Sequence, residues 1–267
     1  MSGPSPCITL LTDFGTGDGY VGAMKGVLLD RCPTARIIDI THDIAPQDVR
    51  AGALALQTAA ACFPAGTIHV AVVDPGVGGP RRPLLIESGG SLFLGPDNGL
   101  LSLAVSPDHN AFELDRVEHF RDDVSTTFHG RDVFAAVAGS LAAGAEPAAV
   151  GSPCAGIVEL SLPLADVGAD YAIGEVLHVD RFGNLVTNLR RQDLICEADR
   201  TVVEIAGRKI QGIVAAYCEV PRGDLLAVFA SAGYLDIAVN EGSAAEALGL
   251  TDPRGCMVTL RRALSES

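Results

Sequence analysis

The chain has 267 residues, 48% of them hydrophobic, which fits one large or two ordinary domains with a sizeable core. Its 19 Lys and Arg are outnumbered by 33 Asp and Glu, giving a formal charge of −14 at pH 7, and so acidic a surface repels nucleic-acid phosphates and anionic membranes. No run approaches the roughly 20 apolar residues of a membrane span, so we expect neither nucleic acid nor a membrane as a partner.

Cysteine usage and the first residues indicate a cytoplasmic protein. The seven cysteines lie far apart, no two form a CxxC pair, and the chain does not start with a charged region followed by an apolar stretch. We therefore expect reduced, structural thiols. The sequence contains no HExxH motif and no Cys/His cluster, so we expect no metal and no organic cofactor.

The first part of the chain alternates strand and helix patterns, which predicts a Rossmann-like α/β domain over residues 1–165 with a largely parallel sheet. Its strands are expected at 7–14, 35–41, 67–74, 83–88 and 91–97, and its helices at 19–32, 47–63 and 130–145.

Residues 160–172 contain two turn regions and no helical period, and we interpret them as a linker. Beyond them come short runs of β-type residues separated by Gly, Asp and Asn, with one short helix candidate at 243–249. This pattern predicts a second domain over residues 172–267, a small β-barrel. Its β-type runs are 172–189, 200–210, 224–230, 233–240 and 255–264.

Two of the expected strands end in an aspartate followed by glycines, Asp13 in TDFGTGDGY and Asp74 in DPGVGG. Ligands of open α/β sheets bind just outside such strand ends. Asp13 and Asp18 flank the first turn and could bind the vicinal hydroxyls of a ribose, or an amine. The alternative is that both are turn formers or caps. The turn does not contain GxGxxG, so it does not indicate dinucleotide binding.

Arg81 lies seven residues after Asp74 and could fold back toward its carboxylate to form part of a site. The alternative is that the two residues form a purely structural ion pair. His129, in FHGRD, lies at the start of an expected helix, where the positive end of the dipole favours neutral imidazole. Such a ring could hold a water or accept a proton, or it could belong to a capping arrangement with Arg131 and Asp132.

In the second part, DRFGNLVTN brings Asp180, Phe182, Asn184 and Asn188 around a tight turn. An aromatic ring beside amide and carboxylate groups suits a planar heterocycle, and a simple hairpin turn is the alternative. Ser231 and Tyr234 lie in another glycine turn, SAGYLD, whose role is equally open.

Taken together and in this order, seven segments resemble the S-adenosyl-L-methionine (SAM) hydroxide adenosyltransferases. These are adenosine-forming SAM hydrolases related to fluorinase and chlorinase. The resemblance covers nearly the whole chain and is carried by LTDFGTGDGYVGAMKG, DITHDIAPQDVRAGALAL, VVDPGVGGPRR, GPDNGLL, FHGRDVFA, VDRFGNLVTNL and GYLDIAVNEGSAAEALG.

The resemblance implies a homotrimer that binds SAM, its substrate, between the N-terminal domain of one subunit and the C-terminal domain of its neighbour. It implies that Asp74, Arg81 and His129 activate the attacking water. The substrate-binding residues that it implies are Asp13 for the ribose, Asp18 and Ser231 with Asp180 for the methionine end, Phe182 for stacking on adenine, Asn184 with backbone groups of Val239 and Glu241 for the adenine edge, and Tyr234.

The resemblance also separates branches of the family. Halogenating relatives carry Tyr at the position of Asp74 and lack the Arg/His pairing, so the Asp/Arg/His set favours water over halide. Fluorinase has Ser at the position of Gly130, but chlorinase also has Gly there. Ala230 departs from the Asn that relatives often have. A SAM-dependent halogenase, a non-catalytic SAM or adenosine sensor, and a metal-dependent hydrolase remain the alternatives.

Overall fold

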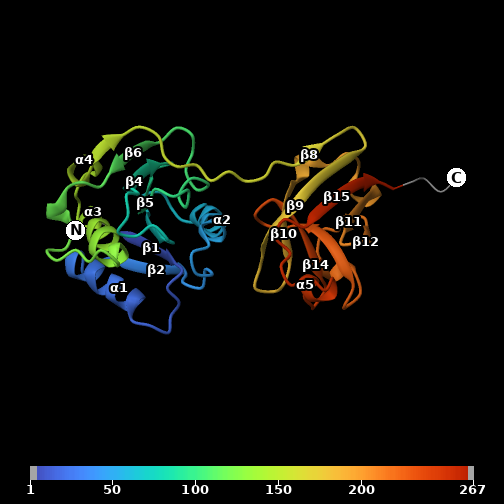
Figure 1. Cartoon of the computed structure of the whole chain (residues 1–267), viewed down its shortest axis with the longest axis horizontal. Coiled ribbons are helices and arrows are strands. Elements are labelled where there is room, and N and C mark those ends of the chain that lie inside the picture. The colour runs from blue at the N-terminus through green and yellow to red at the C-terminus, as the bar shows by residue number, and fades with distance from the viewer. Residues whose placement is uncertain (1–4, 264–267) are drawn as a thin grey trace. The chain divides into compact units, whose positions relative to one another are not determined.

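The computed structural model describes residues 5–263, and the chain divides between Leu160 and Ser161 into two compact units (Figure 1). Leu264, the last residue of the expected run 255–264, lies outside the described residues. Within residues 5–263 no helix is both long and apolar enough to cross a membrane. Each unit has its own hydrophobic core and is described by itself.

The N-terminal unit is built on a seven-stranded mixed sheet of order β2-β1-β3-β5-β4-β6-β7. The first three pairs of neighbouring strands are parallel and the last three are antiparallel. The strands are β1 (Cys7–Thr12), β2 (Arg36–Thr41), β3 (Ile68–Val72), β4 (Pro83–Ser88), β5 (Ser91–Pro96), β6 (Asn110–Glu113) and β7 (Ser152–Cys154).

The expectation of a largely parallel sheet is therefore wrong for half of this sheet. Only Gly89 and Gly90 separate β4 from β5, and both have positive φ, 58° and 76°. A two-residue connection of this kind makes a hairpin, whereas parallel strands need a long crossover. The positions of β1 to β5 were expected from the sequence, whereas β6 and β7 were not, and the direction of β4 follows from the length of the turn.

Helices cover both faces of this sheet (Figure 1). On one face, α1 (Tyr20–Arg31) and α3 (Ala136–Ala142) pack over a core that includes Ile8, Leu10 and the fully buried Phe134. On the other face, Leu56 of α2 (Val49–Ala60) packs with Leu11. A π-helix, η2 (Gly130–Ala135), leads into α3. The remaining helices of this unit are η1 (Val117–His119) and α4 (Pro147–Val150).

The C-terminal unit is an antiparallel sheet of order β12-β11-β15-β9-β10-β14-β13, with β8 paired to β9. Its end strands β12 and β13 contact each other, so the sheet curls into a nearly closed barrel around one core. The strands are β8 (Asp166–Val167), β9 (Tyr171–Val179), β10 (Leu185–Arg190), β11 (Thr201–Ile205), β12 (Arg208–Gln211), β13 (Leu225–Phe229), β14 (Tyr234–Val239) and β15 (Met257–Arg262).

Short helices lie between these strands: η3 (Arg191–Asp193), η4 (Ala198–Arg200), η5 (Tyr217–Glu219) and α5 (Ala244–Ala247). The residues interpreted as a linker, 160–172, are not structureless, since they contain β8. The Gly168 N–H donates to the Tyr171 carbonyl in the turn that returns β8 along β9.

The contact of α2 with the sheet depends on Gly52. A Cβ at this position would lie 2.8 Å from Leu100 Cδ1 and 3.1 Å from Val73 Cγ2, both in the core. We expect Gly52→Val to lower the free energy of unfolding by about 1–3 kcal/mol through overpacking. Gly22, in α1, has open space around its Cβ position, so Gly22→Ala should raise stability by about 0.5–1 kcal/mol. Denaturant unfolding of both variants measures this, and equal effects would contradict it.

Candidate functional site

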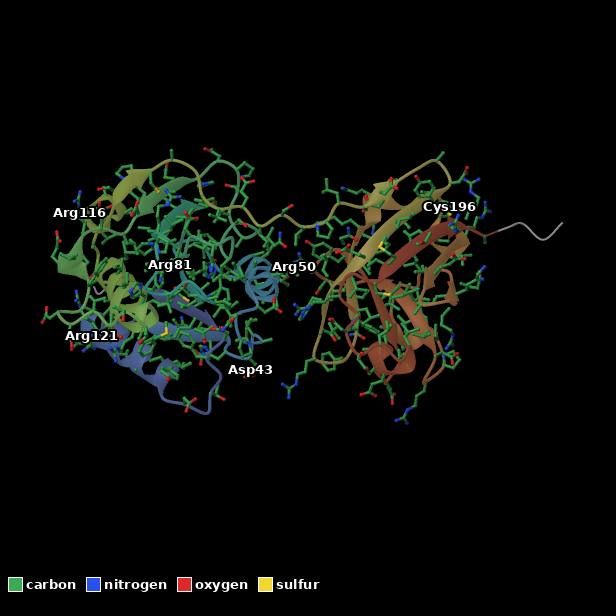
Figure 2. The ribbon with its side chains drawn as sticks, in the orientation of Figure 1. Asp43, Arg50, Arg81, Arg116, Arg121 and Cys196 are labelled. Carbon is green, nitrogen blue, oxygen red and sulfur yellow. The ribbon has the colours of Figure 1, made fainter. Side chains whose placement is uncertain are left out.

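Three side chains that are far apart in the sequence meet in the N-terminal unit: Asp74 after β3, Arg81 before β4 and His129 before η2. Arg81 Nε donates to Asp74 Oδ1 at 3.1 Å and to Oδ2 at 2.9 Å, and its Nη2 also contacts Oδ2. The same Nη2 lies 2.9 Å from His129 Nδ1. Figure 2 labels Arg81 within this unit. Arg81 is thus the central member of a hydrogen-bonded trio.

The trio fixes the protonation of the imidazole. A guanidinium can only donate, so His129 Nδ1 accepts the hydrogen bond from Arg81. Burial, and then the charge of Arg81, lowers the pKa of His129 against the opposing influence of Asp74 and Asp132, and the ring is neutral at pH 7. A neutral imidazole that accepts at Nδ1 carries its proton on Nε2. His129 therefore offers a hydrogen-bond donor, not a base, at its other nitrogen.

The trio is well shielded from solvent. The side chains of Arg81 and Asp74 are 9% and 4% exposed. The Arg81 guanidinium carbon lies 5.6 Å from the ring centre of Phe134, which is fully buried. Charge-assisted hydrogen bonds with so little water around them hold their partners in one geometry.

Glycines allow the loops of the site to approach one another. Gly78 has φ +74°, and a Cβ there would lie 2.4 Å from the Thr126 carbonyl, in the loop that leads to His129. At Gly130 a Cβ would lie 3.2 Å from the Phe14 ring. A side chain at either position would separate segments that the trio requires to be close.

The loop before His129 is anchored by Asp132, whose side chain is fully buried. It accepts from Arg131 Nε at 2.6 Å and from the Ser125 N–H at 2.9 Å, and Arg121 lies 3.3 Å away. Burial alone would raise the pKa of Asp132, but the hydrogen bonds from Arg131 and Ser125 hold it below its usual value. Arg131 and Asp132 thus support the loop, but they do not form the expected capping arrangement, because no side-chain cap hydrogen bond is made at the start of η2.

Asp13, Asp74 and His129 line one cavity of about 320 Å³ in this unit, together with Phe14, Gln47 and Thr127 among others. Asp13 Oδ2 accepts from the Gln47 N–H at 2.8 Å. Asp18 is exposed and does not line this cavity. Gln47 lies in the segment DITHDIAPQDVRAGALAL that carries the family resemblance, but its uncharged side chain gave no reason to predict a role for it.

A second cavity, of about 640 Å³, lies in the C-terminal unit. Five residues singled out from the sequence line it, and so do three that were not, Tyr217, Gly242 and Ser243. The five are Asp180, Phe182, Asn184, Val239 and Glu241. Phe182 is 76% exposed and Tyr217 41% exposed, so two aromatic rings are open to a ligand here.

Asp180 orients Asn184 in this cavity. Its Oδ1 accepts from the N–H groups of Phe182 and Asn184, at 2.8 and 2.9 Å, and its Oδ2 accepts from Asn184 Nδ2 at 2.8 Å. One of the two N–H groups of Asn184 Nδ2 is thereby used, which fixes the plane of the amide and leaves its oxygen to accept from a ligand. The Asp180 carboxylate stabilises the hairpin turn in which it lies, as the hairpin alternative proposed. It also orients the amide of Asn184 toward a ligand.

Tyr234 and Ser231 do not line the 640 Å³ cavity. The Tyr234 hydroxyl accepts from Arg190 Nη2 at 2.7 Å, and both residues line another cavity of about 320 Å³ with Asn188. Ser231 is exposed in the turn before β14. His42 is buried, with Nδ1 2.8 Å from Thr12 Oγ1. It lines neither the cavity that contains Asp13 nor the 640 Å³ cavity.

One further titratable group was missed by the sequence analysis. Asp236, in β14, is buried, and its Oδ1 has no hydrogen-bond partner among the described residues. Burial, and then the charge of Asp180, raises its pKa to about 7. Between residues 5 and 263, no group of three or more His, Cys, Asp or Glu side chains could hold a metal ion.

Both units match family models, the SAM hydroxide adenosyltransferase N-terminal domain over residues 8–151 and the C-terminal domain over residues 174–254. The chain is 42% identical over 253 residues to (R)-S-adenosyl-L-methionine hydrolase of Salinispora tropica, covering 93% of this chain and 95% of that protein. It is 29% identical to a fluorinase of Nocardia brasiliensis, covering 72% and 74%. The crystal structure of an uncharacterized conserved protein from Thermotoga maritima superposes with a TM-score of 0.86 at 35% identity, covering 96% and 100%.

Removal of the Arg81 charge should change the titration of His129. We expect Arg81→Met to raise the pKa of His129 above its wild-type value, because the positive charge that disfavours imidazolium is gone and Asp74 remains. Histidine titration by NMR measures this. His69 serves as the control, since burial alone lowers its pKa to about 4 and it should titrate there in both proteins. An unchanged His129 titration would contradict the trio.

Proposed function

The chain belongs to the SAM hydroxide adenosyltransferase family, and on this premise we propose that it hydrolyses SAM to adenosine and L-methionine. The observation that carries the proposal is the hydrogen-bonded trio of Asp74, Arg81 and His129, two members of which, Asp74 and His129, line the same cavity as Asp13. Curated relatives named as SAM hydrolases match along most of their length.

The reaction requires a nucleophile more than an acid. The sulfonium of SAM leaves as neutral methionine thioether and needs no protonation. Water attacks the ribose 5′-carbon from the side opposite sulfur, the C–S bond breaks, and the positive charge appears as a released proton. Fixing a water in line with sulfur can supply roughly 7–11 kcal/mol of the barrier reduction.

The hydrogen bonds of the trio support distinct roles for its members. Asp74 accepts the proton of the attacking water. A carboxylate is a strong enough base for this, because the water becomes acidic once its oxygen starts to bond to the 5′-carbon. His129 donates from Nε2 to the oxygen of that water or of the nascent hydroxyl. Arg81 holds both partners and stabilises negative charge that develops on oxygen.

The remaining residues divide between the two cavities. Asp13 suits the ribose hydroxyls in the N-terminal unit. In the C-terminal unit, Phe182 and Tyr217 suit stacking on adenine, and the Asn184 oxygen suits its exocyclic amine. We assign Asp18, Ser231 and Asp180 to the methionine end on family resemblance, although the carboxylate oxygens of Asp180 already accept three hydrogen bonds.

Several finer properties belong to the same proposal: a homotrimer with its SAM sites between subunits, a cytoplasmic location and activity without an added cofactor. The parallel strands β2-β1-β3-β5 support a Rossmann-like description of half of the N-terminal sheet. A SAM-dependent halogenase is the second candidate, favoured by the similarity to fluorinase.

Product analysis in ¹⁸O-labelled water tests the function. We expect SAM, incubated with the protein in buffer without added metal, to give adenosine that carries ¹⁸O at its 5′-hydroxyl, together with methionine. Parallel incubations with chloride or fluoride should give the same products. A 5′-halo-5′-deoxyadenosine would instead establish the halogenase, and bound but unreacted SAM would establish the sensor.

Variants of the trio should separate chemistry from binding. We expect Asp74→Ala, Arg81→Ala and His129→Ala each to lower kcat about 10²–10⁴-fold while changing the Kd for SAM little, because their contacts act on the attacking water. Asp13→Ala should instead weaken SAM binding. Steady-state kinetics and calorimetry measure both quantities. Asp30→Ala, an exposed acid at the end of α1, is the control. Equal losses in kcat and affinity would contradict the assigned roles.

A further inference from the structure

Gln47 has an unusual backbone for its residue type. Within residues 5–263, only three non-glycine residues have positive φ: Gln47 at 67°, Ala206 at 47° and Glu241 at 54°. Ala206 forms a two-residue hairpin turn with Gly207 between β11 and β12, a turn type that requires positive φ. Gln47 lies in no hairpin. It precedes α2, and a left-handed backbone is unfavourable for a non-glycine residue, so the surrounding structure must stabilise it.

The left-handed turn at Gln47 connects two loops of the candidate site. The Gln47 N–H donates to Asp13 Oδ2 at 2.8 Å, and its carbonyl accepts from the Val49 N–H at 3.0 Å. Asp48, the next residue, caps α2 by accepting from the Ala51 N–H. One residue after Phe14, the Gly15 N–H donates to the His42 carbonyl at 2.8 Å. Two hydrogen bonds therefore join the segment 13–15 to the segment 42–48, one at Asp13 and one at Gly15.

The hydrogen bond to Asp13 restricts a carboxylate that otherwise extends from a glycine-rich turn. A backbone N–H that donates to an ionised carboxylate forms a charge-assisted bond, which fixes the direction of the remaining lone pairs. Gln47 also lines the cavity that contains Asp13, Asp74 and His129. The strained residue is thus located at the site, next to the carboxylate assigned to the ribose.

We propose that Gln47 is a positioning residue for Asp13: its left-handed backbone directs its N–H onto Oδ2 and aligns the carboxylate for the two ribose hydroxyls of SAM. This inference rests on the proposed function for the identity of the ligand. The backbone carries the role, so the conformation allowed at position 47 matters more than the side chain there.

Substitutions that differ in their tolerance of positive φ test the inference. Gln47→Val and Gln47→Thr are β-branched and oppose this conformation, whereas Gln47→Asn and Gln47→Gly accept it. Loss of a hydrogen bond to a charged group corresponds to roughly 10–100-fold, so we expect the β-branched variants to weaken the Kd for adenosine and raise KM for SAM by about tenfold or more. Their kcat should stay within about twofold, and the Asn and Gly variants should bind within about threefold of wild type.

Two controls separate alignment of Asp13 from loss of stability. Ala206→Val imposes the same backbone conflict in the C-terminal unit, and it should lower Tm without changing Kd or KM. In an Asp13→Ala background, Gln47→Val should have little further effect, since residues that act through one contact are not additive. A ligand that lacks the 2′- and 3′-hydroxyls of ribose, 2′,3′-dideoxyadenosine, should bind with the same Kd to the wild-type protein and to Gln47→Val.

The outcomes are distinguishable from failure of the proposed function. Wild-type protein that does not turn over SAM would refute the hydrolase, and the adenosine Kd series would still test Gln47. Equal weakening by all four substitutions would overturn the inference, because it would place the role in the glutamine side chain rather than in the backbone. So would unchanged adenosine binding in Gln47→Val, or full additivity with Asp13→Ala.

Discussion

The site depends on the inability of a guanidinium to accept a hydrogen bond. Arg81 contacts both Asp74 and His129, so each must present a lone pair to it. This single constraint holds the Asp74 carboxyl group as an acceptor paired with Arg81, and it sets the imidazole tautomer with the proton on Nε2. The cavity therefore receives a carboxylate acceptor and an imidazole donor whose roles are fixed before any ligand arrives.

The fold around Arg81 serves geometry more than stability. A buried ion pair contributes little net folding energy, because desolvation offsets most of the attraction. The surrounding residues allow the loops that carry the trio to come close to one another. Gly78 lets the Asp74 turn contact Thr126, and buried Asp132 holds the loop that ends in His129. The π-helix that begins at Gly130 follows directly. Irregular backbone is concentrated where the three side chains must meet.

The sequence predicts part of this site for a physical reason. Asp13 and Asp74 each follow a buried strand, and β1 and β3 are parallel neighbours, so both carboxylates reach the same edge of the sheet. His129 comes from a distant loop, and only the family resemblance brought it to Asp74. Gln47 was missed because Gln has no preference for positive φ, and Tyr217 because its segment has no period. The mixed sheet was missed although the two residues between the expected strands 83–88 and 91–97, Gly89 and Gly90, are typical of a hairpin.

The groups of the trio suit water, the nucleophile of the proposed reaction, better than they suit a halide. In the trio, Arg81 donates to both partners, Asp74 is an acceptor, and His129 keeps a donor at Nε2. A halide has to exchange its hydration shell for hydrogen-bond donors in the site, and the Asp74 carboxylate on the cavity wall repels an anion. A protonated His129 would attract anions. Burial and the charge of Arg81 lower the pKa of His129, so they disfavour this cationic form. A water molecule has no such requirement, because it needs only one acceptor and one donor, and the trio provides both.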